Sequence, residues 1–151
     1  MIDRFERFIL TISEIDKNWH KVASDVMSEY GLKGPFVVYI VALNRNSEGV
    51  TASQLAEICG RNKADVSRAM KDMESKGLVK RRNENSNLYR AKLTLTEKGK
   101  AAAERVIKAA AKAVEFGGKG INDAKREIFY EILGMISSNL KEMSKKGLDQ
   151  K

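Results

Sequence analysis

The stretch from Val50 to Gly99 constrains the fold most, because helix caps and glycines divide it into short elements. Thr51 and Gln54 have the spacing of a capping box, in which the Thr51 hydroxyl accepts a hydrogen bond from the Gln54 backbone N–H and the Gln54 side chain reaches back. Gly60 can supply the left-handed residue that ends a helix. The pattern predicts a short helix over these residues. Its apolar face is expected to hold Leu55, Ile58 and Cys59.

A second amphipathic helix is predicted directly after the first. Asn62 is a favourable N-cap, and Gly77 is a favourable stop. Between them, residues at the spacing i, i+3, i+4 and i+7 form an apolar stripe of Val66, Ala69, Met70 and Met73. The opposite face is expected to be exposed and to carry Ala64, Arg68 and Lys71, flanked by Asp65 and Ser67.

A β-hairpin is predicted after the second helix. Residues 78–82 and 89–95 read as strands, and the turn-forming run Asn83-Glu-Asn-Ser-Asn87 separates them. The second strand alternates strictly, because one side holds Tyr89, Ala91, Leu93 and Leu95. The other side holds Arg90, Lys92 and Thr94, which predicts a half-buried hairpin with a basic outer face.

A helix, a tight turn, a second helix and a hairpin form a winged helix-turn-helix. In this motif the second helix can lie in the major groove of DNA, while the hairpin touches the flanking backbone or the minor groove. Residues 61–100 contain 12 Lys or Arg against 5 Asp or Glu, so their net charge of +7 is nearly the whole +8 of the chain. Such a concentration is typical of a polyphosphate partner, and a basic surface that only maintains solubility is the alternative.

The ordered motifs resemble the MarR family of bacterial and archaeal transcriptional regulators. The resemblance extends from about Leu32 to Asn139. It is carried by Thr51-Ala-Ser-Gln-Leu-Ala56, by Val66-Ser-Arg68 followed by Met73-Glu-Ser-Lys-Gly-Leu-Val79, and by Leu95-Thr-Glu-Lys-Gly99. The resemblance implies a homodimer in which long terminal helices hold two winged lobes apart, so that both reach one pseudo-palindromic operator in double-stranded DNA.

The tip of the wing departs from the family pattern. Many members carry an Asp-x-Arg pair there, whereas this chain reads Asn87-Leu88-Tyr89, with Arg90 one residue further on. The candidates for the arginine that would enter the minor groove are therefore Arg90, Arg82 and Arg81.

The whole chain has the length of one domain, with 151 residues. We expect a mainly α fold with a small β-hairpin wing: a winged helix-turn-helix lobe over residues 33–99, flanked by N-terminal (1–32) and C-terminal (100–147) dimerisation helices. Gly31 closes the first long helix and Pro35 opens the next, while Thr96 and Asn122 are caps for the last two. The wide apolar stripes of the terminal helices predict a dimer interface, and packing within one chain is the alternative.

Candidate DNA contacts lie on both short helices and on the wing. Arg68 and Lys71 occupy the centre of the exposed face of the second helix, and Arg suits bidentate contact with guanine. Ser67 and Asn62 could serve bases or phosphates. The set on the helices is Ser53, Gln54, Asn62, Lys63, Ala64, Asp65, Ser67, Arg68 and Lys71. The wing would add phosphate or minor-groove contacts from Lys80, Arg81, Arg82, Arg90 and Lys92.

Enzymatic, cofactor and metal chemistry are not expected. The chain has one His, one Cys and no glycine-rich phosphate loop, so neither a metal cage nor a nucleophile paired with His can be assembled within one chain. Cys59 as a redox switch is an alternative, but its place on an apolar face favours a small hydrophobic role. No apolar run approaches the length of a membrane span and no export leader is evident, so the expected compartment is the cytoplasm.

Four residues are candidates for an effector site: Trp19, His20, Phe36 and Tyr39. Aromatic walls with one or two polar tips suit small phenolic or other hydrophobic ligands, although aromatic residues at helical spacing are often plain core. The sequence predicts a sequence-specific DNA-binding transcriptional regulator, a repressor that such an effector releases. A winged-helix protein-interaction module and a metal- or thiol-responsive sensor are the alternatives.

Overall fold

The computed structural model describes residues 2–82 and 90–147. Its elements are the helices α1 (Ile2–Ser28), the 3-10 helix η1 (Gly34–Phe36), α2 (Val37–Arg45), α3 (Ala52–Cys59), α4 (Lys63–Ser75), the strands β1 (Val79–Arg82) and β2 (Lys92–Leu95), and the helices α5 (Glu97–Gly117) and α6 (Asp123–Lys146). This mainly helical chain with one two-stranded hairpin confirms the predicted fold class.

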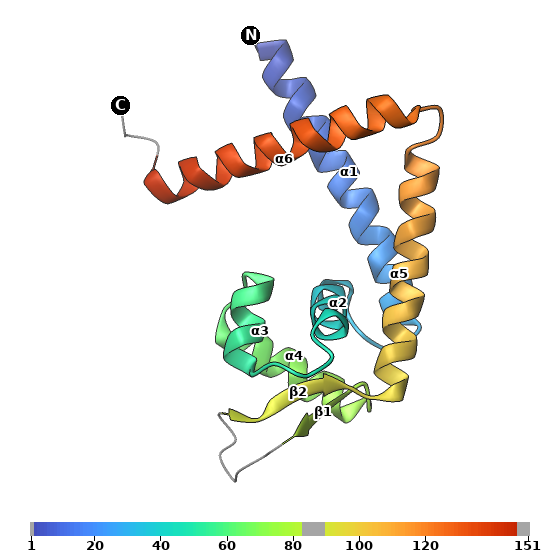
Figure 1. The fold of residues 1–151 in the computed structure, drawn as a ribbon, viewed down its shortest axis with the longest axis vertical. Helices are drawn as coiled ribbons and strands as arrows, with labels where there is room; N and C mark the ends of the chain where they lie inside the picture. Colours follow the sequence, from blue (N-terminus) through green and yellow to red (C-terminus); the bar gives the residue numbers. More distant parts are fainter. Residues whose placement is uncertain (1, 83–89, 148–151) are drawn as a thin grey trace. The chain divides into compact units, whose positions relative to one another are not determined.

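The chain forms two compact units, residues 1–113 and 114–151. In the first unit, α2, α3 and α4 gather beside the hairpin (Figure 1). The ends of two longer helices complete this core, with Met27 at the end of α1 and Ala102 and Ala103 near the start of α5. Its largest fully buried side chains are Met27, Ile40, Leu43, Leu55, Val66, Met70, Met73, Leu78 and Leu93. The predicted division into a 33–99 lobe and flanking dimerisation helices stays a prediction.

The hairpin is antiparallel, with Val79 opposite Leu95 and Arg81 opposite Leu93. The predicted alternation is confirmed for the described residues, because Ala91, Leu93 and Leu95 are buried. Val50 pairs with Leu93 from the outer edge of β2, through N–H···O hydrogen bonds of 3.2 and 2.7 Å. The predicted turn at residues 83–87 and Tyr89 lie outside the described residues.

The second face of β2 is less exposed than its sequence pattern suggested. Lys92 and Thr94 are half-buried, and the Thr94 Oγ1 atom is buried without a hydrogen-bond partner among the described residues. Gly49 lies against this face, because a Cβ atom on it would come within 2.9 Å of the Thr94 Cγ2 atom and 3.0 Å of the Lys92 Cβ atom. The approach of residues 49 and 50 to β2 is a long-range contact that alternation within one strand does not predict.

The predicted caps are confirmed. Thr51 and Gln54 form the capping box of α3, Asn62 caps α4, and Asn122 caps α6. Thr96 caps α5, since its Oγ1 atom accepts from the Gly99 backbone N–H at 3.1 Å. Each of these local hydrogen bonds satisfies an N–H that has no partner within its helix.

Two sequence-based expectations need correction. Ile58 is 51% exposed, so the buried face of α3 consists of Leu55 and Ala56, with Cys59 packed at the edge of the core. Helical spacing places Ala56 and Ile58 on opposite sides of Leu55. The packing of α3 on its neighbours decides which of the two is buried. Pro35 opens the short 3-10 helix η1, and α2 begins two residues later at Val37.

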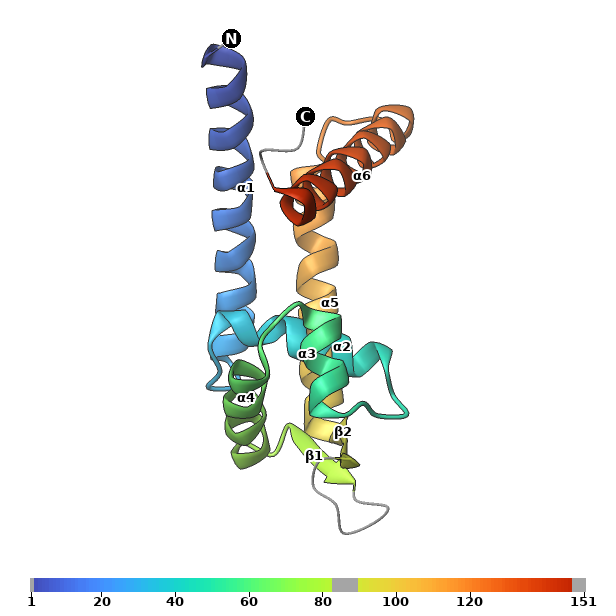
Figure 2. The same cartoon turned by 90° about the vertical axis from the view of Figure 1, so that its left-hand side faces the viewer.

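Many apolar side chains on the long helices α1 and α6 are exposed. In α1, residues 3–21 are all exposed, and the helix continues away from the winged lobe (Figure 2). In the second unit, α6 has no buried residue. Apolar residues exposed on α1 are Phe5, Phe8, Ile9, Leu10, Ile12, Ile15 and Trp19, and those on α6 are Ile128, Phe129, Tyr130, Ile132, Met135, Leu140 and Met143.

Candidate nucleic-acid interface

Helix α4 presents a polar face to solvent while its other face is buried. Val66, Met70 and Met73 have no exposed surface, which fixes the rotation of the helix about its axis. Of the residues expected on the opposite face, Ala64, Ser67, Arg68 and Lys71 are exposed, and Asp65 is half-buried. Lys63, at the start of the helix, is also exposed. The structure thus gathers the predicted recognition residues on one accessible surface of one helix.

Arg68 forms an exposed ion pair within its own helix. It forms an ion pair with Asp65, three residues earlier, and Asp65 Oδ2 also accepts from the Asn62 side-chain amide at 2.7 Å. The Arg68 side chain is 71% exposed, and ion pairs at such positions contribute only about 0–1 kcal/mol. The guanidinium can therefore turn from Asp65 to an external acceptor at little cost.

The basic residues of the hairpin do not share one environment. Lys80, Arg82 and Arg90 are exposed, whereas Lys92 is half-buried. Arg81 lies on the same side as Leu93, and its Nε atom donates to Glu74 Oε1 of α4 at 2.8 Å. Both side chains of this pair are less than a third exposed. Arg81 therefore links the wing to α4, and sequence spacing could not show this because Glu74 lies seven residues away on a different element.

The two candidate contacts of α3 differ in whether their side chains already form a hydrogen bond within the helix cap. Ser53 is exposed, whereas Gln54 has its Oε1 atom occupied by the Thr51 backbone N–H at 2.9 Å. Only the amide N–H groups of Gln54 remain for a further partner. Arg61, in the turn between α3 and α4, is also exposed and lies outside the predicted set.

The four candidate effector residues fall into two pairs. Tyr39 is buried and Phe36 packs against it, with ring centroids 6.0 Å apart. Trp19 and His20 lie on the exposed length of α1, where His20 Nδ1 is 2.8 Å from the Asp16 carbonyl oxygen. Desolvation by burial raises the pKa of the Tyr39 hydroxyl. An effector site that joins both pairs stays a prediction.

Cys59 is half-buried, and its Sγ atom lies 3.8 Å from the Val38 carbonyl oxygen. Burial raises the pKa of its thiol, which disfavours the reactive thiolate.

Within residues 2–82 and 90–147, no group of three or more His, Cys, Asp or Glu residues could hold a metal ion. Among the same residues, no helix has the length and apolar character needed to cross a membrane.

The helices α3 and α4, the tight turn between them and the hairpin that follows define a winged helix-turn-helix. Comparison with known proteins agrees with this class. Residues 30–86 match the family model described as the MarR family. No curated protein matches the chain.

Solved structures of transcriptional regulators, two of them described as MarR-family proteins, are similar over nearly the whole chain. A Listeria monocytogenes protein assigned to the MarR family and complexed with 26mer DNA is 22% identical, with 95% of this chain and 97% of that chain covered and a TM-score of 0.77. A MarR transcriptional regulator from Methanosarcina mazei Go1 is 23% identical, with 91% and 92% covered and a TM-score of 0.75. The transcriptional regulator SlyA is 20% identical, with 89% and 94% covered and a TM-score of 0.77.

The resemblance predicted from the sequence is therefore confirmed. Residues 30–86 match the MarR family, and the described chain has the fold of solved MarR-family transcriptional regulators.

Proposed function

We propose that this protein is a transcriptional regulator that binds double-stranded DNA through α4 and the hairpin. The observation that carries the proposal is the exposed face of α4, where Ser67, Arg68 and Lys71 project from a helix whose other face is fully buried. An α-helix of this kind fits the major groove, and Arg can donate two hydrogen bonds to guanine O6 and N7.

The basic wing and the comparisons support the same assignment. Residues 61–100 hold a net charge of +7, which favours a polyphosphate partner. The similar Listeria monocytogenes structure was determined with 26mer DNA. We assign phosphate contacts first to the exposed residues Lys80, Arg82 and Arg90, and we assign Arg81 a role in fixing the wing against α4.

The active form in this proposal is a homodimer on a pseudo-palindromic operator. The apolar side chains that α1 and α6 leave exposed would be covered by a second copy of the chain. Two recognition helices must sit about one turn of DNA apart, roughly 34 Å, to enter successive major grooves. The dimer therefore sets which half-site spacing is bound, and the regulator would act in the cytoplasm beside the chromosome.

We further propose that the protein represses transcription rather than activating it. The protein acts as a repressor, and a small phenolic or other hydrophobic effector near Trp19, His20, Phe36 and Tyr39 releases it. A ligand that favours a different lobe spacing disfavours the DNA-bound form, and such coupling is typically about 1–3 kcal/mol.

Replacement of Arg68 by Ala tests the DNA-binding assignment, with Lys80→Ala on the wing as the comparison. Arg68→Ala should cost about 1–3 kcal/mol per half-site and relax base preference, as selection of bound sequences from a random duplex pool would show. Lys80→Ala should weaken all sequences to a similar degree, because a phosphate contact carries no sequence information. Sequence-blind losses in both variants would contradict the placement of α4 in the major groove, and binding to acidic proteins alone would favour an interaction module.

A further inference from the structure

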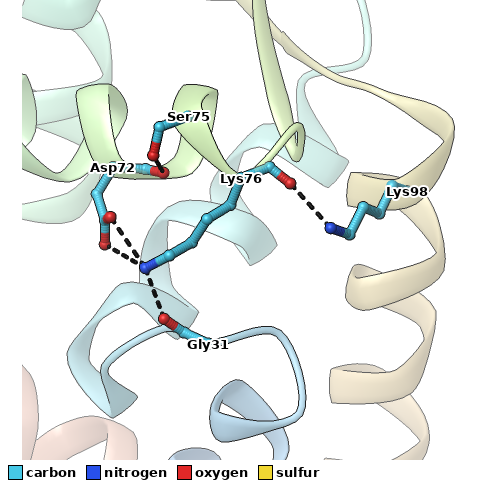
Figure 3. Close-up of polar contacts among 5 residues, drawn as sticks. All are labelled: Gly31, Asp72, Ser75, Lys76 and Lys98. Atoms are coloured by element: carbon cyan, nitrogen blue, oxygen red, sulfur yellow. Dashed lines mark hydrogen bonds and ion pairs between the residues drawn. The ribbon is translucent and has the colours of Figure 1, made fainter.

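Lys76, at the C-terminal end of α4, has its ammonium group enclosed by three oxygen atoms. Its Nζ atom lies 2.6 Å from the Gly31 carbonyl oxygen, 2.9 Å from Asp72 Oδ1 and 3.0 Å from Asp72 Oδ2 (Figure 3). An ammonium group has three N–H donors, so three acceptors occupy its full capacity. The Asp72 carboxylate also neutralises its charge. A phosphate would have to displace one of these acceptors before it could bind Lys76.

The backbone carbonyl of the same residue is joined to a second helix. The Lys98 Nζ atom of α5 donates to the Lys76 carbonyl oxygen at 2.9 Å (Figure 3). The last carbonyls of a helix lack partners within it, so this bond satisfies a group that would otherwise need water. Arg105 of α5 also donates two hydrogen bonds to Glu29, at 3.2 and 2.9 Å. The end of α4, the turn after α1 and the start of α5 are thus connected pairwise.

The turn that accepts from Lys76 has a defined shape. Gly31 adopts φ +66°, and the backbone N–H groups of Gly31 and Leu32 donate to Ser28 and Met27, which is the Schellman pattern at the end of a helix. The carbonyl of Gly31 is therefore held in place when Lys76 reaches it. The hydrogen bond spans 45 residues in sequence, so it ties α4 directly to the end of α1.

We propose that Lys76 is a positioning residue for DNA binding, which fixes the orientation of α4 relative to α1 and makes no phosphate contact itself. The proposal rests on the function proposed above. Because the spacing between two recognition helices must match a turn of DNA, a change in the angle of α4 on its scaffold would weaken binding at a distance from the DNA. A lysine at the end of a recognition helix would ordinarily be counted among the phosphate contacts.

The salt dependence of binding separates positioning from phosphate contact. The test variant is Lys76→Met, and the matched variant is Lys71→Met, because Lys71 is exposed on the same helix. Lys76→Met should weaken binding to a selected duplex by about tenfold, within the usual range of coupling between separate sites, with an unchanged slope of log affinity against log salt. Lys71→Met should make the slope shallower by about 0.9 per half-site. An equally shallow slope, or an unchanged affinity, in Lys76→Met would overturn the proposal.

Hydrogen exchange gives a second measurement that needs no DNA. Lys76→Met should speed exchange of the Gly31 and Leu32 amides, whereas the equivalent amides of Gly60 and Arg61 after α3 serve as an internal control. Lys76→Arg should restore slow exchange, because the guanidinium keeps the charge and the donors. Unchanged exchange in Lys76→Met would overturn this proposal alone. Failure of the wild-type protein to bind any duplex, with faster exchange in Lys76→Met, would overturn the DNA-binding function and with it the positioning role.

Discussion

Apolar residues of the winged lobe form a buried core, whereas many of those on the long helices are exposed. In the lobe, the apolar stripe of α4 is buried together with Leu55 and Leu93, so the chain completes this core by itself. In α6, side chains such as Ile132 and Leu140 are about half exposed, and α1 is similar over residues 3–21. Because extended exposed apolar faces often mark interaction surfaces, the contrast supports the proposal that a second copy of the chain covers the long helices.

The largest loss of dimer stability is expected when a charged residue replaces an apolar one in the proposed dimer interface. Ile132→Asp would place an unpaired carboxylate in the proposed dimer interface, which costs several kcal/mol in practice. Sedimentation should show monomer or aggregate, and operator binding should be lost. Ser138→Asp, on the polar side of the same helix, should remain dimeric. A stable, DNA-binding Ile132→Asp dimer would place the interface elsewhere.

A smaller loss is expected from a cavity inside the lobe. Leu93→Ala removes a side chain with no exposed surface and should destabilise the protein by about 2–5 kcal/mol. Ile58→Ala alters a side chain that is 51% exposed, and it should change stability by about 0.5 kcal/mol or less. Urea denaturation at one protein concentration measures both. Equal losses would mean that the packing of α3 described above is wrong.

The smallest effect concerns the proposed effector. Trp19 is the only tryptophan and is 42% exposed on α1, so its fluorescence reports directly on this region. Phenolic acids should quench it and weaken operator binding by about 1–3 kcal/mol. Trp19→Phe removes the signal but keeps an aromatic ring, so its DNA binding should still respond to ligand. Quenching without any change in DNA affinity would separate the ligand site from regulation.

Local signals in the sequence predicted much of the fold. The cap at Asn62 and the stop at Gly60 depend on residues three or four positions apart, and both appear in the structure as expected. The burial of Val66 and Met73 follows from helical spacing in the same way. These features need no knowledge of distant parts of the chain.

The contacts that the sequence did not reveal depend on distant residues. Arg81 is predicted as a phosphate or minor-groove contact, and the structure adds an ion pair with Glu74 of α4 that sequence spacing does not reveal. The sequence gives no signal for Lys76, because its partner at Gly31 is 45 residues away. Gly49 likewise lies against Lys92, a contact between residues 43 positions apart that the sequence does not show. Periodicity predicts which face of an element is buried, whereas the partners of a long polar side chain follow only from the tertiary arrangement.

A salt titration of binding to duplex DNA tests the central claim most directly. If two copies of the lobe together neutralise about eight phosphates, log affinity should fall against log salt with a slope of about −7, equivalent to a loss of about four powers of ten between 50 and 200 mM salt. A selected operator should bind more tightly than a random duplex at every salt concentration. A flat salt response, or no binding at low salt, would contradict the assignment of α4 and the hairpin to DNA.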